Sequence, residues 1–256
     1  MSILSSIFNT GSTAEKTAVF GDIHSNIEAL DAVLKDMKQK GVSRFICTGD
    51  TVGYGADPSA CIQRLRELNT VTVRGNHDHY CVGNKIPEDV NDSARAAALW
   101  TEKQLSTAES IWLLNLPLEQ QVGELGVVHS TYEPGQNWPY IFNAQNAEPS
   151  IQLQPVPLAF FGHIHFPMVF IQNRKGTIQK EKFCKIKIQK GCRYFINPGS
   201  VGQPRDGDPR AAYALYDPAR KTVTLRRVEY DIETAAKKIL DAGLPSRNAK
   251  RLALGK

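Results

Sequence analysis

The sequence lacks any apolar run close to the 18 or so residues that a membrane-spanning helix needs. Its first 14 residues have neither the basic start nor the long apolar core of a secretory signal peptide. Its five cysteines form no C-x-x-C pair and are odd in number, which argues against a disulfide framework. We therefore expect a cytoplasmic protein with reduced thiols and no membrane partner.

Charge of either sign is also modest. The chain has 31 basic and 26 acidic residues, a net charge of +5, which is below the charge density of a dedicated nucleic-acid-binding protein. Internal repeats and low-complexity linkers are absent, and 256 residues are ample for one large domain. We expect a flexible N-terminal arm over residues 1–16, one domain over 17–245 and a basic tail over 246–256, with nucleic acid not expected as a partner.

The first part of the chain alternates short β-prone segments with helical patterns. Strands are predicted at 17–20, 44–47 and 71–73. Between them lie a helix opened by the capping-box pattern Ser25 to Glu28 and ended by Gly41, and a second helix over 58–68. Short connections between such units are typical of a parallel sheet. Further along we predict helices at 91–105, 106–114 and from 231 to 243, strands at 125–128 and 158–161, antiparallel strands within 168–196, and a hairpin within 211–230.

Histidines are few, and five of the six lie in segments that follow predicted strands, none of them on a predicted helix surface. Histidine is the commonest metal ligand and the usual acid or base near neutral pH, so this placement indicates chemistry. The segments are Asp22-Ile23-His24, Gly49-Asp50-Thr51-Val52-Gly53, Gly75-Asn76-His77-Asp78, His129 and Gly162-His163-Ile164-His165.

Three of these segments are expected to meet in space. Asp22, Asp50 and Asn76 each lie two or three residues past a strand, at intervals of 28 and 26 residues. Ligands collect outside the carboxyl ends of parallel strands, so successive strand–helix–strand units would bring all three to one rim.

The residue types indicate a metal pocket. Asp22 with His24, and His163 with His165, stand two residues apart, so in an extended segment each pair points the same way. With Asp50 between them they would form a mixed oxygen and nitrogen pocket for Mn, Fe or Zn. Two divalent ions bring +4 and two carboxylates remove 2, which leaves about +2 to attract a phosphate and hold a hydroxide nucleophile.

The ordered series D-x-H, G-D-x-x-G, G-N-H-D, H and G-H-x-H resembles the calcineurin-like metallophosphoesterase superfamily over residues 17–230. The loop from Asn197 to Arg205 is similar to its small bacterial and archaeal branch. The resemblance implies a four-layer α/β/β/α sandwich of two mixed β-sheets flanked by helices. It also implies a phosphoesterase that hydrolyses a small phosphomonoester or phosphodiester, nucleotide types included, through a metal-bridging hydroxide.

The resemblance further implies the roles of individual residues. One divalent ion would bind Asp22, His24, Asp50 and His165, and a second would bind Asp50, Asn76, His129 and His163. Mn, Fe, Zn, Ni and Co all suit these ligands, and the native metal stays open. His77 would bind no metal but would protonate the leaving oxygen or, together with Asn76, contact the phosphoryl group.

One segment departs from the eukaryotic-type protein phosphatases of the family. Where those proteins have G-D-x-V-D-R-G, this chain has Gly49-Asp-Thr-Val-Gly-Tyr-Gly55, without the Asp that orients the histidine or the Arg that grips phosphate. Asp78 and Asp92 are candidate partners for His77, and Arg74 and Arg205 are candidate phosphate grips. We expect His79 to support the site from its surface rather than to contact substrate.

Two alternative functions stay open. A non-catalytic interaction scaffold of the same fold would be expected to have lost metal ligands, and none is lost here. A nuclease could use the eight basic residues of segment 174–193, although such a run more often protects an exposed strand edge. The 246–256 tail is expected to be a terminal helix, and Tyr54 and Trp138 to pack at the rim rather than stack on a nucleobase.

Overall fold

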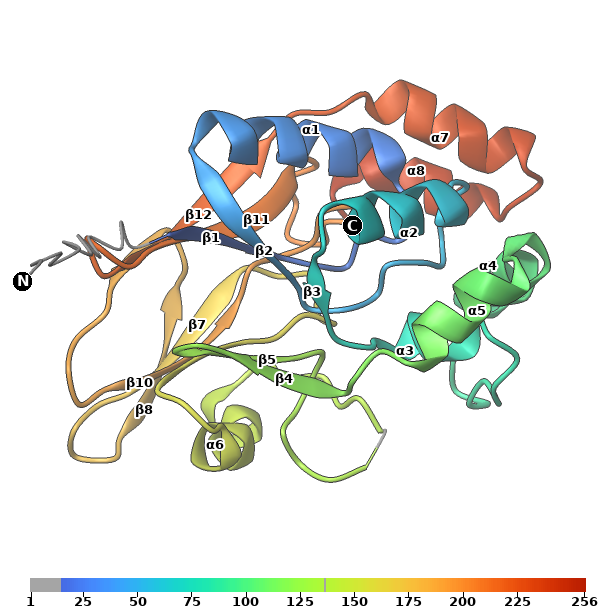
Figure 1. Cartoon of the computed structure of the whole chain (residues 1–256). Coiled ribbons are helices and arrows are strands. Elements are labelled where there is room, and N and C mark those ends of the chain that lie inside the picture. Colours follow the sequence, from blue (N-terminus) through green and yellow to red (C-terminus); the bar gives the residue numbers. More distant parts are fainter. Residues whose placement is uncertain (1–14, 136) are drawn as a thin grey trace, which may run out of the picture.

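Two six-stranded sheets form the centre of the molecule (Figure 1). The structure, a computed structural model, describes residues 15–135 and 137–256. The first sheet has the order β3 (Val71–Thr72), β2 (Val42–Cys47), β1 (Lys16–Phe20), β11 (Ala211–Asp217), β12 (Thr222–Val228), β9 (Lys185–Lys187). The second has the order β4 (Glu119–Val122), β5 (Leu125–Val128), β6 (Leu158–Phe160), β10 (Arg193–Asn197), β7 (Met168–Gln172), β8 (Ile178–Lys182). Both are mixed: β1, β2 and β3 are parallel, as are β5, β6 and β10.

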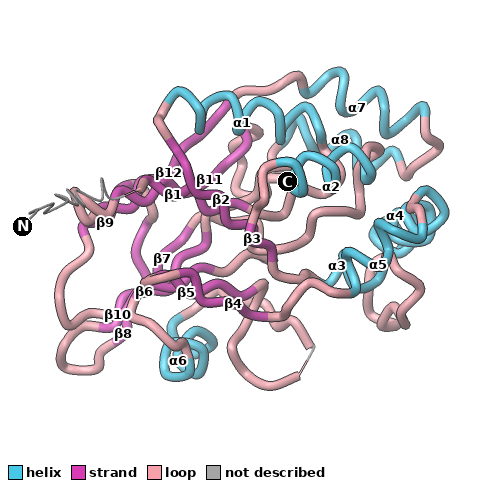
Figure 2. Tube along the Cα trace, viewed as in Figure 1, coloured by secondary structure: helices cyan, strands magenta, loops and turns pink. Residues whose placement is uncertain are grey.

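Helices flank the two sheets on their outer sides (Figures 1 and 2). On the side of the first sheet lie α1 (Ile27–Gln39), α2 (Pro58–Glu67), α7 (Ile232–Asp241) and α8 (Ser246–Leu254). On the side of the second sheet lies α6 (Ala144–Leu153), and α3 (Asn76–Tyr80), α4 (Asp92–Gln104) and α5 (Thr107–Leu114) lie at one end. The predicted four-layer α/β/β/α sandwich is confirmed.

Alternating side chains of the strands build separate cores on their two faces. In β1, Val19 packs between the sheets with Phe160, whereas Ala18 and Phe20 pack under α1 with Leu30. All five are buried. Burial on both faces fixes the register of β1, because a slip by one residue would exchange the two sets.

Several local predictions need correction. Helix α1 begins at Ile27 and is capped by Asn26, whose side chain accepts from the Ala29 amide, rather than by the predicted Ser25 box. His77 and His79 lie in the short helix α3, so the expectation that no histidine is helical was wrong. Strand β4 and helix α6, which contains Pro149, were not predicted.

The two ends of the chain were predicted as an N-terminal arm and a basic C-terminal tail. The expected N-terminal arm lies outside the described residues apart from its last two, and Lys16 already begins β1. The basic C-terminal segment forms the predicted terminal helix, α8, which buries Asn248 and Leu252 against the rest of the protein. Among residues 15–135 and 137–256, no helix is long and apolar enough to cross a membrane.

Candidate metal centre

The carboxyl ends of β1, β2 and β3 carry the first three site residues. Because these strands are parallel neighbours, the loops after them run side by side and hydrogen-bond to each other. The amide of Asp22 donates to the Gly49 carbonyl at 2.9 Å, and the amide of His77 donates to the Asp50 carboxylate at 2.8 Å. Asp22, Asp50 and Asn76 therefore meet at one rim, as the strand spacing predicts.

Four buried side chains form a first cluster at this rim. They are Asp22, His24, Asp50 and His165, and their candidate ligand atoms all lie within 4.8 Å of one another. The Nε2 atoms of His24 and His165 are 3.0 Å apart, and His165 Nε2 is 3.5 Å from the Asp22 carboxylate. Oxygen and nitrogen donors at these distances can enclose one divalent ion.

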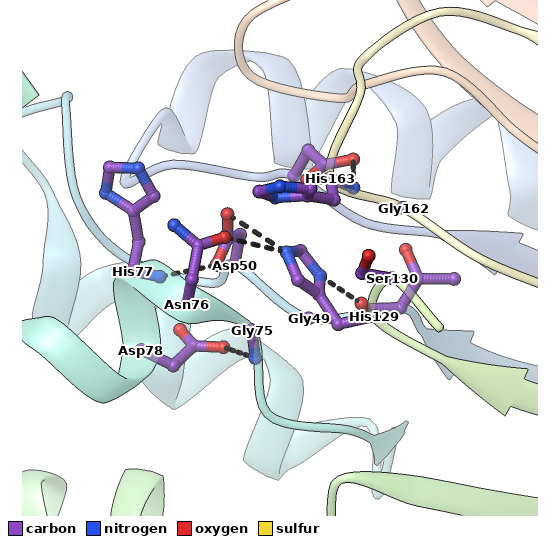
Figure 3. A network of polar contacts seen from close by, with 12 residues as sticks. Gly49, Asp50, Gly75, Asn76, His77, Asp78, His129, Ser130, Gly162 and His163 are labelled. Carbon is purple, nitrogen blue, oxygen red and sulfur yellow. Dashed lines mark hydrogen bonds and ion pairs between the residues drawn. The ribbon is translucent and has the colours of Figure 1, made fainter. Parts of the chain in front are cut away.

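A second cluster shares Asp50 with the first. It contains His129 and His163, again with candidate ligand atoms within 4.8 Å of one another. His129 Nε2 is 3.4 Å from the Asp50 carboxylate and 3.1 Å from the Asn76 amide oxygen. Figure 3 shows the Asp50 carboxylate between the rings of His77, His129 and His163, with the Asn76 amide beside it. Asp50 is thus shared by the two clusters.

The protonation of the histidines tests whether cations fit. His24, His129 and His165 each direct Nδ1 at a main-chain carbonyl oxygen, which only accepts hydrogen bonds, so each Nδ1 carries the proton. An Nε2 atom that carries no second proton then presents a lone pair to the centre of the site. Lone pairs of His24 and His165 at 3.0 Å, beside two carboxylates, repel one another unless a cation lies between them. The donor set fits two divalent ions.

The pKa values of the metal-free site point the same way. Burial raises the pKa of Asp22 to about 7. Burial lowers the pKa of His129, but the Asp50 carboxylate outweighs it and raises the pKa to about 9. Burial lowers the pKa of His163 to about 3, and those of His24 and His165 well below the usual range. Without metal, protons on Asp22 and His129 compensate part of the negative charge of the site, as bound cations would.

The backbone at the ligands is strained. Five of the seven predicted ligands have positive φ angles, where L-residues are uncommon: Asp22 48°, His24 50°, Asp50 52°, His163 69° and His165 59°. Such conformations cost of order 1–3 kcal/mol each and persist where the surroundings enforce them. Gly75 permits the crowding, since a Cβ atom there would lie 2.1 Å from the Asp50 carboxylate.

His77 stands beside the two clusters at the edge of a cleft. Its ring lies 4.5 Å from the Tyr54 ring, and its Nδ1 atom is buried and has no hydrogen-bond partner among the described residues. Burial lowers the pKa of His77 to about 4, so the imidazole is neutral near pH 7. The cleft has a volume of about 400 Å³ and is also lined by Asn76, Tyr80, Trp138 and His163.

Three further predicted residues do not join the site. The hydrogen bonds to the Asp78 carboxylate come from the amides of Thr51, Val52 and Gly75, at 2.8, 3.2 and 3.0 Å, so it ties two ligand-bearing loops together rather than orienting His77. The Arg74 guanidinium donates to the carbonyl of Leu114 at the end of α5. Asp92 is exposed at the start of α4 and is not among the described residues that line the cleft.

Arg205, by contrast, reaches the site. Its guanidinium donates to the Gln203 side chain at 2.9 Å and to the Tyr54 hydroxyl at 3.4 Å, and it lies 5.7 Å from the Tyr54 ring centre. His79 is half-buried beside Trp138, with ring centroids 5.4 Å apart, and does not line the cleft.

Sequence reasoning missed two aromatic residues of the cleft. Tyr80 follows His77 by three residues, so the two side chains lie on the same face of α3. The sequence would have indicated this only if helix α3 had been predicted. Tyr140 has no local signal at all.

The two-sheet fold and the paired clusters of candidate metal ligands agree with the comparisons with known proteins. Residues 16–221 match the family described as the calcineurin-like phosphoesterase superfamily domain. The chain belongs to this superfamily. It is 38% identical over 243 residues to an uncharacterized protein of Methanocaldococcus jannaschii, covering 93% of this chain and 98% of that one.

Solved structures show the same architecture. A metallophosphoesterase from Sphaerobacter thermophilus is 37% identical and superposes with a TM-score of 0.83, covering 95% of this chain and 100% of the other. A hypothetical protein from Pyrococcus horikoshii is 19% identical, with a TM-score of 0.75 over 94% of this chain and 98% of its own. The predicted resemblance to bacterial and archaeal metallophosphoesterases is confirmed.

Proposed function

We propose that this protein hydrolyses a small phosphomonoester or phosphodiester at a dinuclear metal site. The observation that carries the proposal is the sharing of Asp50 by two buried clusters of candidate metal ligands. Asp22, His24, Asp50 and His165 would hold one divalent ion. Asp50, Asn76, His129 and His163 would hold the other.

Two bound divalent ions would neutralise phosphate charge, orient the ester and lower the pKa of water at the site. Mn, Fe, Zn, Ni and Co all remain candidates for this donor set. The chain itself supplies the geometry. Six of the seven ligands lie on loops, Asn76 begins α3, and all seven are buried. A preorganised site of this kind need not reorganise during the reaction.

His77 would act as a hydrogen-bond donor to the phosphoryl or leaving oxygen. Its imidazole is neutral near pH 7 because burial lowers its pKa to about 4. A neutral imidazole still carries one N–H, which can stabilise developing negative charge without giving up the proton. Of the two roles implied by the family resemblance, the buried environment favours this stabilising one over full proton transfer.

The cleft beside His77 suits the group esterified to the phosphate. Its volume of about 400 Å³ is that of a small-ligand pocket. Among the described lining residues Asp89 is the only acid and none is Lys or Arg, so a leaving group without negative charge fits it. Tyr80 and Trp138 offer ring surfaces to such a group. Arg205, which contacts Tyr54, would hold a phosphate oxygen.

The proposal is tested with metal-loaded protein and a panel of phosphomonoesters, phosphodiesters and dinucleoside polyphosphates. We expect two metal ions per chain by elemental analysis and turnover of at least one class. Asp50→Asn should lower both metal content and turnover. His77→Gln should lower kcat by about 100-fold and leave metal content near two, because His77 binds no metal. Protein that binds two ions per chain but hydrolyses no phosphoester class would refute the proposal that it is an enzyme.

The competing functions make different predictions. An interaction scaffold would come out of elemental analysis without stoichiometric metal. A nuclease that uses segment 174–193 would bind DNA or RNA with strong salt dependence. Four of the six lysines of that segment lie in β8 and β9, each at the edge of its sheet, where lysine protects against strand pairing. This placement accounts for these four lysines without a nucleic acid.

A further inference from the structure

The four histidines of the two clusters are not held in the same way. Three of them, His24, His129 and His165, are fixed by hydrogen bonds from Nδ1 to a main-chain carbonyl oxygen. The acceptors are Val52 at 3.1 Å, Thr48 at 2.7 Å and Gln203 at 2.6 Å. The ring of His163 has no such bond within the described part of the chain, and its buried Nε2 has no partner. Something other than a carbonyl must orient this ring.

Tyr140 provides the missing support. Its ring stacks on the ring of His163, with centroids 4.4 Å apart and planes 21° apart. The His163 ring also contacts the His129 ring in an edge-to-face arrangement, with centroids 5.1 Å apart and planes 65° apart. The His163 imidazole is therefore held by one stacked ring and one edge contact, which together restrict its rotation. Stacked and edge-to-face ring pairs at these distances are favourable.

The backbone around Tyr140 is fixed, although its side chain is 52% exposed. The hydroxyl of Ser130, the residue after His129, donates to the Pro139 carbonyl at 2.6 Å. Ile141 is 1% exposed and packs in the core beneath the second sheet. Tyr140 thus stands between two anchored neighbours, at the end of β5 that carries the ligand His129.

We propose that Tyr140 is a positioning residue that orients His163 for the second metal ion, in place of the carbonyl that orients the other three histidines. The proposal rests on the dinuclear site proposed above. Residues that orient a metal ligand typically change metal affinity by 10- to 100-fold when removed. Because a stacked ring is weaker than a hydrogen bond to a charged partner, we expect about a tenfold effect on one metal site.

The test is a calorimetric titration of metal-free protein with Mn²⁺, comparing wild type with three variants at this position. In Tyr140→Ala the affinity of one of the two sites should fall about tenfold, with the other site unchanged. Tyr140→Phe keeps the ring and should match wild type. Tyr140→Leu keeps bulk without a ring and should resemble the alanine variant. Excess Mn²⁺ should bring the weakened site of Tyr140→Ala to the metal occupancy of the wild-type protein, since the ring acts through the metal ligand.

Several outcomes would overturn the proposal. Wild-type affinity at both sites of Tyr140→Ala, an equal loss at both sites, or wild-type behaviour of Tyr140→Leu would each show that stacking does not orient His163. The stacking itself is measurable without metal, because it shifts the NMR signals of the His163 ring upfield, and Tyr140→Ala should abolish the shift. A wild-type protein that binds fewer than two ions would instead count against the proposed dinuclear site, with the NMR comparison still deciding the role of Tyr140.

Discussion

Removing the Asp78 carboxylate should lower the stability of the folded protein and not only its rate of turnover. The carboxylate is buried and accepts hydrogen bonds from the amides of Thr51, Val52 and Gly75. Asp78→Ala leaves three buried donors without a partner, at about 1–3 kcal/mol each, so a loss of about 3–9 kcal/mol of unfolding free energy is expected. For a chain of this size that corresponds to a fall in Tm of about 10 °C or more.

Asp78→Asn provides the matched control. Its amide oxygen can still accept from Thr51 and Val52, while its NH₂ group would face the Gly75 amide donor to donor, so about 1–2 kcal/mol should be lost. Differential scanning calorimetry and metal analysis give the two readouts. An Asp78→Asn protein with wild-type Tm and metal content but no turnover would refute this reasoning, because it would mean that Asp78 acts on His77 during catalysis.

Three further predictions concern protons, phosphate and charge pairs. Metal binding at pH 6 should release about two protons, one from Asp22 and one from His129, whose pKa values are about 7 and 9. At pH 8 it should release about one, from His129, so metal affinity rises with pH. Calorimetric titrations in buffers of different ionisation enthalpy measure the number of protons released. Arg205→Ala should raise KM about tenfold with a smaller effect on kcat. Arg205→Lys should restore only part of the lost substrate affinity because lysine lacks the guanidinium fork, and steady-state kinetics measure both effects. Asp208→Asn should cost about 1 kcal/mol at pH 7. Arg210 lowers the pKa of Asp208 to about 2, so this contribution is present above pH 4 and disappears as the pH falls through 2, which urea unfolding at both pH values checks.

Most of the site could be predicted from the sequence because its residues follow strands at regular intervals. Parallel strands joined by single helices bring their carboxyl ends together whatever the rest of the chain does, so Asp22, Asp50 and Asn76 had to converge. The pair His163 and His165 follows β6, which belongs to the second sheet and pairs there with β5 and β10. That the two sheets would face each other came from the family resemblance, since periodicity alone does not fix sheet packing.

The remaining features depend on contacts between segments distant in sequence, which no local pattern encodes. Asp78 was predicted as a partner of His77 from adjacency, yet its carboxylate meets amides 27 and 26 residues away. Tyr140 stacks on His163 because Ser130 and the core hold its loop in place, and nothing in its own neighbourhood signals that contact. Sequence spacing determined which donors could gather at the rim, whereas the packing of loops on the two sheets decided which neighbours orient them.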